Sequence, residues 1–70
     1  MRIGNYNGYT IVEAKGQYFG FTLPADLVEV LLINQRLTDE QLVKHYNAVN
    51  EGLAVEIGLD TLDYREVEAR

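Results

Sequence analysis

The stretch LPADLVEVLLINQRL, residues 23–37, is the most apolar part of the chain, and the rest must be arranged around it. Six of the seven residues from Leu27 to Ile33 are apolar, which suits either a buried strand or a buried helix. Helical geometry separates the side chains better, because Asp26, Glu29 and Arg36 then share one side. The opposite, apolar side of that helix would comprise Leu27, Val28, Val30, Leu31 and Leu32.

The beginning of this stretch also favours a helix. The fixed φ of Pro24 suits the first helical turn, where its missing N–H is not needed. Asp26 places a negative charge near the positive end of the helix dipole. We therefore predict a core helix, with Ile33 on its polar side as a candidate contact for a partner.

Residues 2–23, which precede the helix, are typical of a three-stranded antiparallel meander. Asn7-Gly8 is the strongest short hairpin signal, since both residues tolerate a positive φ. Lys15-Gly16-Gln17 supplies a second turn. Gly4 and Asn5 weaken the first strand, which we expect to be a short edge strand.

The last strand of this meander shows the alternation expected of a sheet with one buried face. Phe19, Phe21 and Leu23 fall on the same side of an extended chain. We expect this apolar side to pack under the core helix.

A second helix is predicted at residues 39–51 from its N-terminal signature. In a capping box, Thr38 accepts a hydrogen bond from the backbone of Gln41, and the Gln41 side chain reaches back. Leu42, Tyr46, Val49 and Leu53 then recur at helical spacing. Gly52 would lie just past the helix end.

The remaining residues allow two interpretations. Leu53, Val55 and Ile57 alternate as in a strand, and residues 58–60 contain a turn signal before a further alternating run at 61–67. We favour a C-terminal hairpin formed by these two runs. The alternative is a helix that begins near Asp60 and includes residues 66–70.

These elements together predict one α+β domain spanning residues 1–70, a small antiparallel sheet with two helices packed on one face. The chain contains no cysteine, so no disulfide can stabilise a domain of only 70 residues. Met1 is not followed by a signal peptide pattern, and no apolar run approaches the roughly 20 residues that span a membrane. We therefore expect a cytoplasmic protein.

The chain offers little for catalysis or for cofactor binding. It has no serine and no cysteine, so the usual nucleophile–histidine arrangements are absent. His45 is the only histidine and lacks enough partners for a zinc site. The glycines match no phosphate-binding loop. We predict that the protein is not an enzyme and that it uses no cofactor or metal.

The net charge of −5 is carried entirely by the second half of the chain. Residues 1–36 contain three basic and three acidic side chains, whereas residues 37–70 contain three basic and eight acidic ones. The second helix begins with Asp39 and Glu40, which phosphate groups would repel. We predict no direct nucleic-acid binding, and we expect a protein partner with a basic surface or a second copy of the chain.

The candidate partner-binding residues are the acids of the second half and the tyrosines of the meander. Tyrosine is enriched at interfaces, and three tyrosines would lie on the sheet face away from the core helix. The alternative is that they merely shield this face and that the acids are only solvated. The candidates are Glu51, Glu56, Asp60, Asp63, Glu66, Glu68, Tyr6, Tyr9 and Tyr18.

In its small size, its acidity and its lack of cysteine and of motifs, the chain resembles phage-encoded inhibitors of host defence, such as anti-CRISPR proteins. The resemblance is one of size and composition and transfers no residues. It implies an inhibitor that imitates the charge of nucleic acid and blocks a nucleic-acid-binding host complex. Two other functions stay open: a homo-oligomeric structural or accessory subunit, and, third, a small enzyme.

Overall fold

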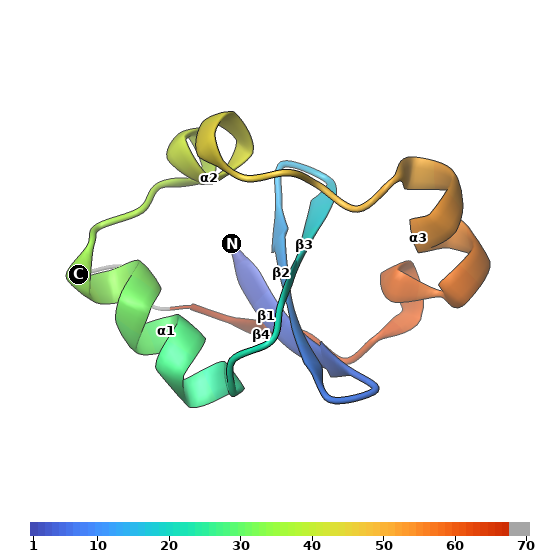
Figure 1. Cartoon of the computed structure of the whole chain (residues 1–70), viewed down its shortest axis with the longest axis horizontal. Coiled ribbons are helices and arrows are strands. Elements are labelled where there is room, and N and C mark those ends of the chain that lie inside the picture. The colour runs from blue at the N-terminus through green and yellow to red at the C-terminus, as the bar shows by residue number, and fades with distance from the viewer. Residues whose placement is uncertain (68–70) are drawn as a thin grey trace.

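A computed structural model describes residues 1–67 and shows a four-stranded antiparallel sheet with helices on both faces (Figure 1). The order of the strands in the sheet is β3-β2-β1-β4. The elements are β1 (Arg2–Tyr6), β2 (Tyr9–Ala14), β3 (Gln17–Phe21), α1 (Ala25–Asn34), α2 (Asp39–His45), α3 (Glu51–Ile57), the 3₁₀ helix η1 (Leu59–Thr61) and β4 (Arg65–Glu66). The predicted α+β class, the N-terminal meander and the core helix are confirmed.

Both hairpins of the meander turn where the sequence predicts. Asn7 and Gly8 have φ values of 49° and 84°, and Lys15 and Gly16 have φ values of 53° and 73°. A turn whose two central residues both have positive φ has a backbone twist that matches the right-handed twist of the flanking strands. The turns therefore fix the register, with Tyr6 opposite Tyr9 and Ala14 opposite Gln17.

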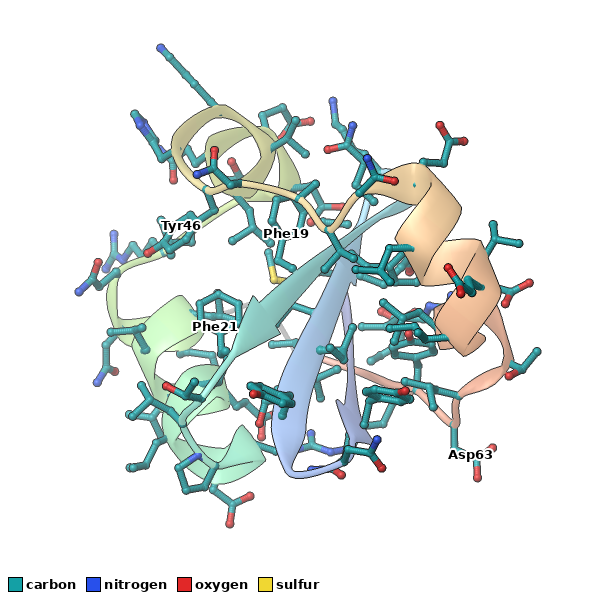
Figure 2. All side chains as sticks on the ribbon, turned by 45° about the vertical axis from the view of Figure 1, so that its right-hand side comes forward. Phe19, Phe21, Tyr46 and Asp63 are labelled. Atoms are coloured by element: carbon teal, nitrogen blue, oxygen red, sulfur yellow. The ribbon has the colours of Figure 1, made fainter. Side chains whose placement is uncertain are left out.

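The first face of the sheet packs against α1 and α2. Ile3, Val12 and Phe19 are aligned across three strands and are buried. The same cluster contains Ala14 of β2, Val28 and Leu32 of α1, and Leu42 of α2. Phe21 lies half-buried beside Tyr46, with ring centroids 5.7 Å apart (Figure 2). Leu23 follows the strand and is exposed, so only part of the predicted Phe19/Phe21/Leu23 side is buried.

The buried side of α1 is narrower than the sequence predicts. Only Val28 and Leu32 are buried, whereas Leu27 and Val30 are 55% and 51% exposed. The reason is that one layer of sheet contacts one narrow side of a helix. The exposed apolar side chains on the outer side of α1 therefore pack against no other element within residues 1–67.

The prediction that β1 is a short edge strand is wrong. β1 pairs with β2 on one side and with β4 on the other, so it is an inner strand. Gly4 does not weaken it, because the ring of Tyr64 packs where a Gly4 side chain would lie. A contact from the distant end of the chain thus replaces the missing side chain.

The second helix begins as predicted but ends six residues early. Thr38 and Gln41 form the capping box, yet α2 stops at His45. Tyr46 is extended and contacts Phe21, and the Val49 N–H donates a hydrogen bond to the Tyr18 carbonyl at 2.7 Å. Residues 46–50 therefore run along the edge of β3 instead of continuing the helix.

Residues 53–57 form a helix, not the predicted strand. Asn50 caps α3 by accepting a hydrogen bond from the Leu53 N–H, so Gly52 lies inside a helix rather than after one. α3 covers the second face of the sheet, where Ala54, Leu59 and Ile11 are buried in a second cluster. Two helices on one face are as predicted, and α3 adds a layer on the other.

The C-terminal strand exists, but the predicted hairpin does not. Arg65 and Glu66 pair with β1, because residues 53–57 are helical and offer no strand edge. The Arg65 guanidinium donates two hydrogen bonds to Glu29, at 2.8 and 2.9 Å, and so ties β4 to α1. The alternative helix at residues 66–70 is not seen at Glu66–Val67, and Glu68, Ala69 and Arg70 lie outside the described residues.

Candidate functional site

Five of the predicted acidic residues lie on the α3 side of the sheet. They belong to α3, to η1, to the loop that follows and to β4, and all are exposed. Figure 2 shows Asp63 pointing away from the body of the molecule. The sixth candidate acid, Glu68, lies outside the described residues. We call the five the acidic surface: Glu51, Glu56, Asp60, Asp63 and Glu66.

Within residues 1–67, no member of the acidic surface forms an ion pair with a basic side chain or the N-terminus. The ion pairs found there join Met1 to Asp39, Arg2 to Glu13, Lys15 to Glu40 and Arg65 to Glu29. Three of these four acids are on α1 or α2. The hydrogen bonds from Arg65 hold the pKa of Glu29 below its usual value. The unneutralised negative charge of the described chain is therefore concentrated on the α3 side.

Two exposed apolar residues interrupt the acidic surface. Leu53 and Val55 of α3 are 47% and 69% exposed, while Ala54 between them is buried. The strand interpretation placed Leu53, Val55 and Ile57 together on one side. As a helix, the segment turns Ala54 toward the sheet and leaves Leu53 and Val55 in solvent. These two are the site residues that the sequence analysis missed, and the Asn50 capping signal was the clue to the helix.

A groove of about 510 Å³ runs between α3 and the β2–β3 turn. Glu51 and Asp60 of the acidic surface line it, as do Val55 and Lys15. The acidic surface is thus hollowed on one side and can receive a protruding side chain from a partner.

The three candidate tyrosines lie on the second face of the sheet, as predicted, but α3 covers part of this face. Tyr6 and Tyr18 are half-buried against the second cluster. Tyr9 at the hairpin turn is 52% exposed. Tyr6 and Tyr18 thus support α3 from below, and Tyr9 alone presents a largely free side chain.

Tyr64 positions the loop that carries Asp60 and Asp63. Its hydroxyl donates a hydrogen bond to the Leu59 carbonyl, and the Arg2 guanidinium lies 4.9 Å from its ring centroid. Burial raises the pKa of Tyr64 to about 12, so the hydroxyl stays protonated and remains a donor at neutral pH. Its ring also lies 6.1 Å from that of Tyr18. The loop is therefore held on the sheet rather than free.

The other chemistry-bearing residue types do not gather into a site. His45 is exposed at the end of α2. No group of three or more histidine or acidic side chains within residues 1–67 is arranged to hold a metal ion. None of the helices in the described part of the chain has the length and apolar content needed to cross a membrane.

Comparison of the chain with protein-family models, curated proteins and solved structures finds no significant match.

Proposed function

We propose that the chain is a small protein-binding module that acts by occupying a basic surface of its partner. The observation that carries this proposal is the segregation of unneutralised charge. Five exposed acids that form no ion pair within residues 1–67 share the α3 side, whereas the acids of α1 and α2 are largely paired. Charge of one sign gathered on one side steers an oppositely charged partner and orients it.

The apolar residues within the acidic surface support a protein as the partner. Protein interfaces commonly have an apolar centre and a polar rim. Leu53 and Val55 supply exposed apolar side chains on the two flanks of α3, with Glu56 between them on the same helix. A surface that served only solubility would gain nothing from two exposed aliphatic side chains.

A concrete form of this proposal is imitation of nucleic-acid charge. Basic surfaces that bind nucleic acid do so mainly through phosphate contacts, which need negative charge and little sequence information. The acidic surface would compete with nucleic acid for a basic surface of this kind in the cytoplasm. The resemblance to phage-encoded inhibitors of the anti-CRISPR kind implies such a role. In this role the chain binds and carries no catalytic residue.

The first experiment is a pull-down with the tagged chain from lysate of its native host, at low and at high salt. We expect to recover a nucleic-acid-binding protein that is released by salt or by added duplex DNA. Salt screens the carboxylates, and DNA competes with them for the basic surface of the partner. Recovery of partners that neither treatment releases would contradict charge imitation.

A matched pair of variants then tests the surface. Replacing Glu56, Asp60, Asp63 and Glu66 by their amides should abolish partner binding and leave the circular dichroism spectrum unchanged. The control neutralises the four acids that form ion pairs, and so changes the net charge equally: Glu13, Glu29, Asp39 and Glu40. Equal binding by both variants would show that the acidic surface is only solvated.

The second candidate function is a structural or accessory subunit that associates with itself. The observation in its favour is the exposed apolar side of α1, at Leu27 and Val30. Under this alternative, the pull-down would recover only the chain itself.

A further inference from the structure

The groove between α3 and the β2–β3 turn combines aliphatic side chains with two carboxylates. Glu51, Ala54 and Val55 line it, and their spacing of three and four residues places them along one side of α3. Glu51 is the first residue of α3, and Asp60, which also lines the groove, follows the helix in η1. Val49 adds a further aliphatic residue from the segment between α2 and α3. A ligand in this groove would therefore meet apolar contacts and negative charge together.

The charge that the groove offers to a ligand is negative. Glu51 and Asp60 are exposed, and neither forms an ion pair within residues 1–67. Lys15 lines the groove as well, but its ammonium lies 3.2 Å from a carboxylate oxygen of Glu40, on α2. The positive charge of Lys15 thus already has a partner, and the two carboxylates leave room for a cation from outside.

The walls of the groove are held in place before any ligand binds. The Val49 N–H donates a hydrogen bond to the Tyr18 carbonyl at 2.7 Å and fixes the segment before α3 to the edge of β3. Asn50 caps α3 by accepting a hydrogen bond from the Leu53 N–H. The groove volume of about 510 Å³ lies within the roughly 300–1,000 Å³ that is typical of ligand pockets. A preformed groove lowers the entropic cost of binding.

We propose that this groove receives an arginine side chain of the protein partner. The inference rests on the proposed function, because it names the group through which the acidic surface recognises a basic surface. It concerns the groove alone, and the other members of the acidic surface contribute attraction at longer range.

An arginine side chain matches both properties of the groove. Its aliphatic stem can lie on Val49, Ala54 and Val55 while its charged head reaches the carboxylates. The guanidinium has five N–H donors in a planar fork, so it can serve carboxylates from more than one direction. A lysine ammonium is more strongly hydrated and is a single point charge, so it loses more and gains less on entering the groove.

Arginine is also the side chain that a nucleic-acid mimic has most reason to bind. Arginine recognises phosphate through two parallel N–H···O bonds, and a carboxylate accepts the same pair of bonds. Contacts to phosphate account for half or more of the hydrogen bonds between proteins and DNA. An arginine held in this groove is therefore withdrawn from the nucleic acid of the partner.

A titration monitored by nuclear magnetic resonance tests the groove without knowledge of the partner. The probes are three blocked tripeptides, acetyl-Gly-X-Gly-amide, in which X is arginine, lysine or citrulline. We expect saturable shifts of the Gly16, Ala48 and Val55 amides by the arginine peptide, with a dissociation constant on the order of 1 mM. The lysine peptide should bind at least 3-fold and the uncharged citrulline peptide at least 10-fold more weakly. Equal binding of arginine and lysine, or no saturation, overturns the proposal.

Glu51→Gln tests the contribution of a groove carboxylate. We expect it to weaken binding of the arginine peptide by about 3- to 10-fold, as loss of one charge-assisted hydrogen bond would. Asp26→Asn is the matched control, because Asp26 is also an exposed acid in the first turn of a helix and forms no ion pair within residues 1–67. Equal losses in both variants would show a general effect of net charge and overturn the groove.

A steric variant tests the groove with no change of charge. Ala48→Phe should fill part of the groove and weaken the arginine peptide by at least 10-fold, since Ala48 lines the groove and is exposed. Asn47→Phe places the same ring on the neighbouring exposed residue, which does not line the groove, and should leave binding unchanged. Circular dichroism confirms that both variants fold. Unchanged binding by Ala48→Phe overturns the proposal.

These outcomes separate the groove from the proposed function. A basic partner that is lost with Glu56, Asp60, Asp63 and Glu66 but retained by Ala48→Phe would support the acidic surface and overturn the groove. Binding of the arginine peptide in the groove, without any basic partner in the pull-down, would support the groove and contradict the proposed function.

Discussion

At the scale of single residues, Gly4 shows how a missing side chain organises this fold. The ring of Tyr64 occupies the space beside Gly4, and Arg2 and Tyr18 pack near the same ring. The Tyr64 hydroxyl in turn bonds to the Leu59 carbonyl and holds η1. One small residue in an inner strand thus allows an aromatic side chain to join the sheet to the loop that carries Asp60 and Asp63.

Gly4→Ala should therefore lower the free energy of unfolding. The added Cβ would lie 2.9 Å from Tyr64 Cδ1 and 3.1 Å from the Asp63 carbonyl oxygen, and the latter is backbone that cannot rotate away. Overpacking of this kind costs about 1–3 kcal/mol. Urea denaturation monitored by circular dichroism measures the change.

Gly20→Ala is the matched control for that substitution. Gly20 also lies in a strand, but its added Cβ would meet only Ile11 Cδ1, at 4.0 Å. We expect no loss, and a gain of up to about 1 kcal/mol from the lower chain entropy of alanine. Equal losses at both glycines would contradict the tight packing of Tyr64 on β1.

At the scale of elements, side-chain caps determine where the helices begin. Thr38 Oγ1 accepts a hydrogen bond from the Gln41 N–H, and Gln41 Oε1 accepts one from the Thr38 N–H. Asn50 caps α3 in the same manner through the Leu53 N–H. Neither cap determines where its helix ends: α2 ends where Tyr46 meets Phe21, and α3 ends at Gly58, whose φ is 77°.

Thr38→Ala should destabilise the protein by about 1 kcal/mol, because the Gln41 N–H at the start of α2 loses its acceptor, the Thr38 hydroxyl. Chemical denaturation measures this loss, and Thr22→Ala, at an exposed residue outside the helices and strands, is the control. A Thr38 variant as stable as the Thr22 variant would show that tertiary contacts alone hold α2 in place.

At the scale of the whole molecule, charge is segregated across the sheet. The α1 and α2 side carries ion pairs that join distant parts of the chain, such as Arg65 to Glu29 and Lys15 to Glu40. The α3 side carries acids that have no such partners within residues 1–67. Clustered like charges lower the free energy of unfolding through mutual repulsion. Such a loss of stability is common at functional surfaces.

The two four-acid variants should accordingly change thermal stability in opposite directions. At low salt, the variant that neutralises Glu56, Asp60, Asp63 and Glu66 should melt a few degrees above the parent chain, because repulsion is relieved. The variant that neutralises the paired acids should melt below it, because the attractions are lost. Differential scanning calorimetry measures both, and added salt should bring the three melting temperatures together. A lower melting temperature for the first variant would mean that the acidic surface stabilises the fold.

The sequence by itself determined the features that depend on a few neighbouring residues. These are the two turns with positive φ at Asn7-Gly8 and Lys15-Gly16, the capping box at Thr38, the helical core stretch and the exclusion of thiol chemistry. It also placed the excess of acidic over basic residues in the second half of the chain. Each follows from backbone sterics, local hydrogen bonds or composition, so no distant contact is needed to specify it.

Other features depend on how distant elements pack against the sheet, and only the tertiary structure decided these. Residues 53–57 suit a strand by their alternation, yet they form a helix because the second face of the sheet needs a cover and Ala54 fits against it. β1 is an inner strand because β4, from the far end of the chain, pairs with the edge of β1 that β2 leaves free. Short apolar runs are compatible with both helical and strand periods, and the choice between them is made by packing across the sheet rather than by the run itself.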